Sequence, residues 1–228
     1  MSRMKQRSPR TGKRRPGQRA AQRILAAALS AALVLGTSTA VLAAPAQREG
    51  GVWYLDDGDI AVTAKADGHQ YLVQAGGAEV LDDHPVISQL GGSTAHTVTL
   101  AGEAGQVADV TLHGVSVAAP ANKAPVSVTS GSARISLAQS SDLTGGSGRP
   151  GIQVAGDSAL TLAGSGALTA RGGSAAAGIG SGDRTPSGNV TITSGDITAI
   201  GGSRAAGIGG GDGSFGGVIA IQGGQIHA

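Results

Sequence analysis

Three aspartates in the second half of the chain are the residues whose type and spacing could support chemistry. Asp183 and Asp212 each follow a glycine at the same place in two closely related segments, and Asp157 lies one segment earlier. Carboxylates stacked on one face could hold Ca²⁺, which prefers oxygen ligands. With an arginine as base, or with carboxylates grouped around a scissile bond, they could also act on a polysaccharide. A Ca²⁺-dependent or polysaccharide-active site is therefore the alternative hypothesis.

The surroundings of these aspartates favour a structural interpretation. Aspartate is common in turns, where its side chain bonds the local backbone. Three arginines near the same turns could balance the acids: Arg171, Arg184 and Arg204. The histidines show no metal-ligand spacing: His69, His84, His96, His113 and His227. We therefore expect no catalytic residue, no metal site and no cofactor.

Charge is distributed unevenly along the 228 residues. The formal net charge of +2 and the pI near 9.3 would suit a nucleic-acid-binding protein. However, nine of the 17 lysines and arginines precede Ile24, and the chain from Ala44 onward carries a net charge of −7. There are also 40 glycines, no cysteine and only four aromatic residues. This composition excludes disulfide scaffolds, thiol chemistry, zinc–thiolate sites and aromatic-rich nucleic-acid surfaces.

The segment 1–43 has the three parts of a secretory signal peptide. A basic stretch ends at Arg23, an apolar run covers 24–35, and small residues surround Ala43. This order predicts cleavage after Ala43, with Ala46 as the second candidate. An uncleaved anchor helix is the alternative, but the apolar run is shorter than the roughly 20 residues that a membrane span needs. We expect an exported chain, secreted or at the cell surface, whose membrane contact is limited to the signal peptide.

The C-terminal part of the chain contains an internal repeat. The sequence Ala-Ala-Gly-Ile-Gly at 176–180 recurs at 205–209, and the flanking segments keep the same offset. Looser copies precede it, and the period is about 26–29 residues, a length typical of solenoid repeats. Each unit holds short alternating runs such as Val-Thr-Ile-Thr, separated by Gly, Ser and Asp. Runs of this length and pattern predict strands rather than helices.

Stacked repeats of short strands predict an all-β fold, a single-stranded parallel β-helix with one repeat of the sequence in each coil. Alternation places Val, Ile and Leu in the interior and Thr or Ser outside. Glycine supplies positive φ and close backbone approach at the corners. In each Gly-Ile-Gly segment the isoleucine is expected to point inward. The structural repeat residues are Gly178, Ile179, Gly180, Gly207, Ile208 and Gly209.

The sequence divides into three segments. These are the signal peptide at 1–43, an N-terminal cap with the first strands at 44–92, and the glycine-rich repeats at 93–228. An atypical first unit is common in solenoids. The repeats reach Ala228 without an evident cap, and an unpaired strand edge favours association. End-to-end self-association through the last coil is therefore a further hypothesis.

Trp53 and Tyr54 belong to the only aromatic and acidic cluster of the sequence, with Asp56, Asp57 and Asp59. A sugar ring could stack on these aromatic faces. The competing interpretation is that Trp53 packs over the open end of the coil. The candidate ligand-binding residues are therefore Trp53, Tyr54, Asp183 and Asp212.

The order of motifs also carries a resemblance. Asp-Gly-Asp-Ile at 57–60, Val-Thr-Leu at 98–100 and the two Ala-Gly-Ile-Gly segments follow one another along residues 52–228. In this the chain resembles the secreted Gly-rich parallel β-helix surface proteins of Gram-positive bacteria, which are often adhesin-like or carbohydrate-binding. We expect a non-catalytic protein that contacts an extracellular polysaccharide, or a host or cell-wall glycan, and no nucleic acid.

Overall fold

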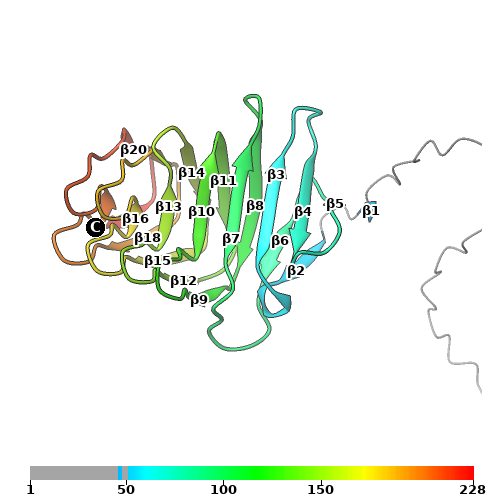
Figure 1. The fold of residues 1–228 in the computed structure, drawn as a ribbon, viewed down its shortest axis with the longest axis horizontal. Coiled ribbons are helices and arrows are strands. Elements are labelled where there is room, and N and C mark those ends of the chain that lie inside the picture. Colours follow the sequence, from blue (N-terminus) through cyan, green and yellow to red (C-terminus); the bar gives the residue numbers. More distant parts are fainter. Residues whose placement is uncertain (1–45, 48–50) are drawn as a thin grey trace, which may run out of the picture. The chain divides into compact units, whose positions relative to one another are not determined.

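The computed structural model describes the backbone of residues 46–47 and the whole of residues 51–228. The predicted signal peptide at 1–43 lies outside the described residues. The described part is an all-β parallel solenoid of about five coils of about 28 residues (Figure 1). Its only helical element is the short 3-10 turn η1 (Leu55–Asp57). None of the described segments is a helix long and apolar enough to cross a membrane.

Three sheets form the sides of the solenoid. Sheet A contains, in spatial order, β1 (Ala46–Gln47), β5 (Val80–Leu81), β4 (Gln70–Gln74), β3 (Ile60–Ala64), β7 (Val98–Gly102), β10 (Val126–Ser130), β13 (Ile152–Val154), β16 (Ile179–Gly180) and β19 (Ile208–Gly209). Sheet B contains β2 (Val52–Tyr54), β6 (Val86–Ser88), β8 (Val107–His113), β11 (Ser132–Leu137), β14 (Ala159–Gly164), β17 (Asn189–Ile192) and β20 (Ile219–Ile221). Sheet C contains β21 (Gln225–His227), β18 (Asp196–Ile200), β15 (Ala167–Arg171), β12 (Ser141–Thr144) and β9 (Ser116–Ala118).

From β7 onward the chain visits sheets A, B and C in the same order five times. We number these coils 1 to 5; they begin at β7, β10, β13, β16 and β19. Parallel pairing aligns equivalent residues of sheet A, which are Val98, Val126, Ile152, Ile179 and Ile208. The spacing of these residues matches the period of the sequence repeat, and the step is longest between the last two coils. The predicted parallel β-helix and the offset of its last two coils are confirmed.

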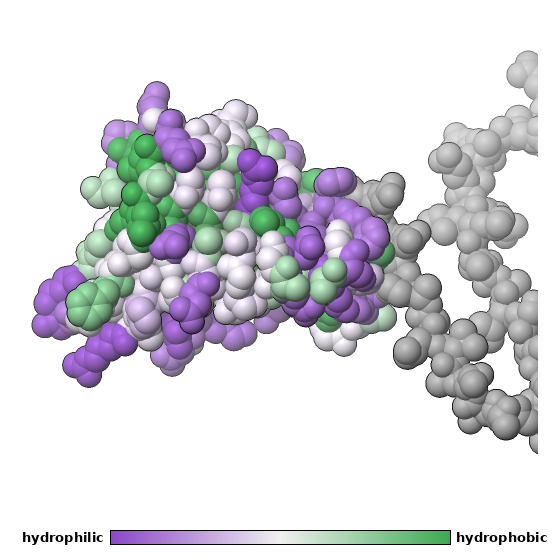
Figure 2. Space-filling view, turned by 90° about the horizontal axis from the view of Figure 1, so that it is seen from above, coloured by the Kyte–Doolittle hydropathy of each residue, from purple (hydrophilic) through white to green (hydrophobic). Residues whose placement is uncertain are grey.

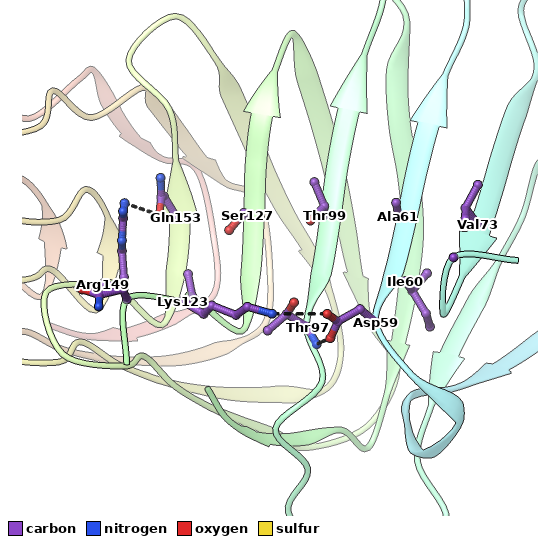
Figure 3. Close-up of a pocket in the computed structure, with 13 residues that line it drawn as sticks. Asp59, Ile60, Ala61, Val73, Thr97, Thr99, Lys123, Ser127, Arg149 and Gln153 are labelled. Atoms are coloured by element: carbon purple, nitrogen blue, oxygen red, sulfur yellow. Dashed lines mark hydrogen bonds and ion pairs between the residues drawn. The ribbon is translucent and has the colours of Figure 1, made fainter. Parts of the chain in front are cut away.

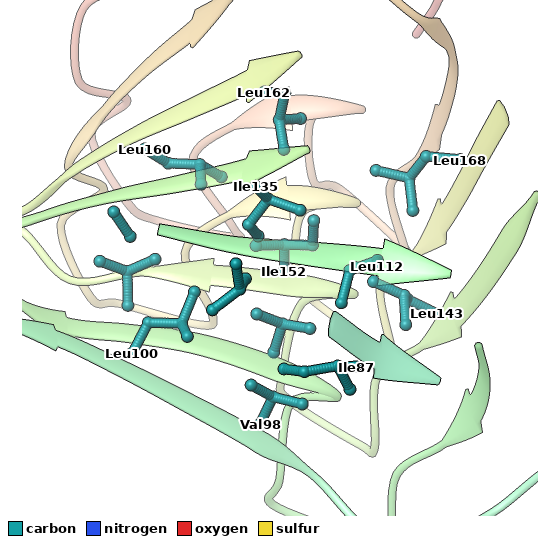
Figure 4. Packing of buried hydrophobic residues seen from close by; sticks show 14 of the residues in the cluster. Ile87, Val98, Leu100, Leu112, Ile135, Leu143, Ile152, Leu160, Leu162 and Leu168 are labelled. Carbon is teal, nitrogen blue, oxygen red and sulfur yellow. The ribbon is translucent and has the colours of Figure 1, made fainter. Parts of the chain in front are cut away.

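Alternation along each strand divides the side chains between the interior and the surface. In β11, Ile135 and Leu137 are buried, whereas Arg134 between Ala133 and Ile135 is exposed. The buried inward residues of coils 1 to 4 join into one column of aliphatic side chains, part of which is shown in Figure 4. Each fully buried Leu or Ile stabilises the fold by about 1.5–3 kcal/mol. This column holds together strands that are too short to be stable alone.

Glycine is required where successive turns touch. A Cβ on Gly146, Gly173 or Gly202 would overlap the carbonyl oxygen of the equivalent residue in the preceding coil, which is Pro120, Gly146 or Gly173. Gly180 supplies the predicted positive φ, because its φ of +135° lies in a region that residues with a Cβ rarely adopt. The expected role of glycine at the corners is confirmed at these positions.

The N-terminal end departs from the regular coil. β3 stacks in parallel on β7, but β4 runs antiparallel to β3, and β5 runs antiparallel to β4 (Figure 1). Trp53, Leu55 and Leu72 are buried here and belong to the same hydrophobic cluster as the coils. These large side chains fill the interior at this end of the solenoid.

Candidate functional site

The aromatic residues that were candidates for sugar stacking lie on β2. Trp53 is only 6% exposed, and its indole N–H donates a hydrogen bond of 2.8 Å to Oδ2 of the buried Asp82. The ring therefore lies largely in the interior and exposes little surface on which a sugar could stack. Tyr54 is half-buried, and its carbonyl oxygen accepts a hydrogen bond from Nε2 of Gln74 at 2.6 Å.

Asp183 and Asp212 lie in stacked turns of coils 4 and 5. The backbone N–H of Arg184 donates to the carbonyl oxygen of Asp212 at 3.0 Å, so the two turns are in contact. Each carboxylate has an arginine partner: Asp183 faces Arg184 at 3.9 Å, and Asp212 faces Arg204 at 2.6 Å. Asp157 is exposed in the shorter equivalent turn of coil 3. Within residues 51–228, no three His, Cys, Asp or Glu residues form a group that could hold a metal ion.

A groove on the outer face of sheet A brings together residues that the sequence patterns did not connect. Its volume is about 480 Å³, and it crosses β3, β7, β10 and β13 (Figure 3). Its floor is a row of outward-facing residues aligned by the strand register: Ala61, Thr99, Ser127 and Gln153. Because adjacent strands lie about 4.8 Å apart, the hydroxyl and amide groups of Thr99, Ser127 and Gln153 extend over roughly 10 Å of this floor.

One edge of this groove is formed by the turns that precede the strands. The carboxylate of Asp59 accepts a 2.7 Å hydrogen bond from the backbone N–H of Thr97 and lies 3.4 Å from Nζ of Lys123. Nδ1 of His96 lies 3.5 Å from the same carboxylate. Partial burial raises the pKa of Asp59, but the Thr97 hydrogen bond and the Lys123 charge together hold that pKa below its ordinary value. Asp59 is therefore ionised at neutral pH and is a poor proton donor.

Arg149 lies further along the same edge (Figure 3). The side chain is half-buried, and Nη1 donates a 3.3 Å hydrogen bond to Oε1 of Gln153 on the groove floor. Among the described residues, no carboxylate lies within 4.0 Å of this guanidinium. Since a guanidinium carries five N–H donors, most of its hydrogen-bonding capacity is left for a ligand.

Lys123 and Arg149 did not stand out in the sequence because they lie in the looser part of the repeat. Lys123 precedes Val126 by three residues, and Arg149 precedes Ile152 by three residues. Aligning the coils on the first residue of each sheet A strand would have placed the two cations at one repeat position.

A second group of charged side chains surrounds the β3–β4 hairpin. Nδ1 of His69 lies 2.9 Å from Oδ2 of Asp83, and this hydrogen bond raises the pKa of His69. The hydroxyl of Tyr71 donates to Asp67 at 2.8 Å, and Nζ of Lys65 lies 4.3 Å from the centre of the Tyr71 ring. These contacts join the hairpin to the segment after β5, and none of the five residues lines the groove.

Another hollow, of about 520 Å³, lies at the turns between sheets B and C. It is lined by Gln139, Ser140 and Ser165, and Asp196 is its only charged lining residue. The groove on sheet A offers a richer set of contacts, because it combines a hydrogen-bonding floor with groups of both charges.

Coil 5 exposes apolar side chains on the edge of sheet B. Figure 2 shows a strongly hydrophobic area near this end of the solenoid. Val218 is 69% exposed, Ile219 42% and Ile221 56%. Their counterparts one coil earlier, Val190 beneath Ile219 and Ile192 beneath Ile221, are fully buried. Ile219 and Ile221 therefore continue the inward-facing rows of Val190 and Ile192, and their aliphatic surface is exposed in the described structure.

Comparison of the chain with family models, with curated proteins and with solved structures finds no match.

Proposed function

We propose that this protein is exported and binds a glycan, without catalysis, in the groove on sheet A. The observation that carries the proposal is the polar floor of Thr99, Ser127 and Gln153, flanked by the cations Lys123 and Arg149. Hydroxyl and amide groups both donate and accept hydrogen bonds, which suits the hydroxyl groups of a sugar chain. The row of polar groups across three neighbouring strands suits an extended ligand better than a compact one.

The groove lining supports binding rather than hydrolysis. A glycosidase needs two carboxyl groups placed around the scissile bond, and Asp59 is the only carboxylate in this lining. The neighbours of Asp59 lower its pKa, whereas a general acid needs a raised pKa. The alternative hypothesis is a polysaccharide-active or Ca²⁺-dependent protein that uses Asp157, Asp183 and Asp212.

The location outside the cell rests on the sequence alone. Residues 1–43 have the order of a secretory signal peptide, and the Gly-rich motifs resemble those of secreted Gram-positive surface proteins. Both observations support a secreted or surface-bound protein that meets polysaccharide outside the cell.

The test is retention on a panel of immobilised polysaccharides, with and without EDTA. Ser127→Ile fills the groove floor, and Ser136→Ile makes the same change on the outer face of sheet B, where Ser136 is also half-buried. We expect the wild type and Ser136→Ile to be retained equally in both buffers, and Ser127→Ile to be lost. Failure of the wild type to bind any glycan would overturn the proposal, and release of shortened or unsaturated sugar would overturn its non-catalytic part.

We also propose that a second copy of the chain covers the edge of coil 5. Ile219 and Ile221 expose aliphatic surface that is buried at every equivalent position of coils 2 to 4. The opposite end carries an antiparallel hairpin and a filled interior. Because the two ends differ, the matching surface is the same edge on another copy, which gives a closed two-fold dimer rather than a filament.

A further inference from the structure

The two cations of the groove occupy the same position in successive coils. The backbone N–H of Lys123 donates to the carbonyl oxygen of Pro120, and that of Arg149 donates to the carbonyl oxygen of Gly146, so the turns are alike. Val126 and Ile152, three residues further on, are aligned in parallel register. Because neighbouring coils are spaced by about 4.8 Å, two like charges are stacked along the edge of the groove.

The fold does not need a charge at this position. In coils 4 and 5 the same turn hydrogen bond is made by Ala176 and Ala205, which donate to Gly173 and Gly202. Like charges on adjacent strands are destabilising when nothing lies between them. The cations are therefore confined to coils 2 and 3, which both line the groove, in a chain whose described residues carry a net negative charge.

Asp59 compensates only one of the two cations. It lies 3.4 Å from Lys123, whereas the described structure offers Arg149 only the neutral oxygen of Gln153 at 3.3 Å. A planar guanidinium binds a carboxylate through two parallel N–H donors, a geometry that a neutral hydroxyl cannot match. The groove thus contains one half-buried cation, Arg149, whose remaining N–H donors can bind a ligand beside the polar floor.

We infer that Arg149 binds the carboxylate of an acidic sugar, so that the glycan of the groove contains uronic acid residues. This inference rests on the proposed glycan-binding function. A single uncompensated cation beside the Lys123–Asp59 pair suits one carboxylate of a ligand bound in the groove. Densely charged nucleic acid fits less well, because the described chain is acidic and the groove lining contains no aromatic residue for base stacking.

The test compares each acidic polymer with its carboxyl-reduced form, which keeps the backbone and removes the charge. Polygalacturonate, alginate and hyaluronan serve as probes, with neutral glucans beside them. The variants are Arg149→Gln and, as a matched control, Arg171→Gln, which removes an exposed arginine of β15 outside the groove. We expect the wild type and Arg171→Gln to prefer at least one acidic polymer over its reduced form by about ten- to hundredfold, and Arg149→Gln to lose that preference.

The outcomes separate this inference from the proposed function. If the wild type binds glycans but never prefers a carboxylated form, or if Arg149→Gln keeps the preference, the inference is wrong and glycan binding stands. If no glycan of the panel is retained, both fail. If Arg149→Gln unfolds at the same temperature as the wild type, its loss of preference is not a folding defect. If its unfolding temperature is lower, the same binding comparison is made with Arg149→Lys, which should keep part of the preference.

Discussion

Ile179 of β16 lies in register with Ile208 of β19, one coil further along the chain. Ile179 is fully buried, and Ile208 packs against the same hydrophobic cluster. Each isoleucine stands between two glycines. The segments with the least side-chain volume in the coil therefore each contribute one large aliphatic group to the core.

Truncating Ile179 should destabilise the solenoid strongly. Ile179→Ala removes buried methyl groups and leaves a cavity that the short strands cannot close, so we expect the free energy of unfolding to fall by about 2–5 kcal/mol. Ile200→Ala is the matched control, because Ile200 is 41% exposed on the outer face of β18 and should cost about 0.5 kcal/mol or less. Chemical denaturation followed by circular dichroism measures both. Equal losses in the two variants would contradict the inward orientation of Ile179.

A methyl group on Gly173 should be poorly tolerated. Its Cβ would overlap the carbonyl oxygen of Gly146 in the neighbouring turn, and a backbone atom cannot move aside as a flexible side chain could. We expect Gly173→Ala to cost about 1–3 kcal/mol or more, since the stacked turns must separate. Gly92→Ala is the control, because nothing lies within 4 Å of the added Cβ. Its stability should stay within about 0.5 kcal/mol of the wild type. A neutral Gly173→Ala would show that the turns are not in close contact.

The repeat could be predicted from the sequence because its most regular residues are those that pack in the interior of the solenoid. The constant offset between its last two copies gave the correct pairing of Ile179 with Ile208 and of Val190 with Ile219. Glycine spacing also indicated the corners, since both positive φ and close backbone approach depend on a missing Cβ. These features are local or strictly periodic, so they can be recognised in a single sequence.

The N-terminal unit and the groove depend on contacts between residues that are not related by the sequence repeat, so the repeat could not predict them. Trp53 packs in the hydrophobic cluster, and Asp82, 29 residues further along the chain, accepts the hydrogen bond of its indole N–H. No sequence pattern links these two residues. The groove combines Asp59 from the first unit with Lys123 and Arg149 from coils 2 and 3. Coils 4 and 5, where the repeat is clearest, carry alanine at the cation position. The most regular repeats of the sequence therefore contain no residue that could have indicated the groove.

The contact between His69 and Asp83 should make the cap sensitive to pH. The hydrogen bond that His69 donates to Asp83, together with the charge of Asp83, raises the pKa of His69 above 6.5. A raised pKa means that the protonated histidine stabilises the folded state. The contribution is complete below 6.5, the value in the unfolded chain, and is lost as the pH rises through the higher folded value.

An NMR titration of the His69 ring measures this effect directly. We expect the midpoint to lie above 6.5 in the wild type and to fall in Asp83→Asn. Asp57→Asn removes an exposed acid outside this hairpin and should leave the midpoint unchanged. A His69 midpoint that Asp83→Asn does not move would refute the pairing.

The edge of coil 5 should hold two copies of the chain together. Ile221 is 56% exposed although its partner in register, Ile192, is fully buried, and association would return this aliphatic surface to the core. We expect sedimentation velocity to show a dimer at micromolar concentration, and Ile221→Glu to shift it to the monomer because a carboxylate would be buried at the contact. Val107→Glu is the control, since Val107 is 46% exposed on β8, away from coil 5, and should leave the dimer intact. A wild type that stays monomeric over this range, or an Ile221→Glu variant that still dimerises, would show that the second copy does not bind at this edge.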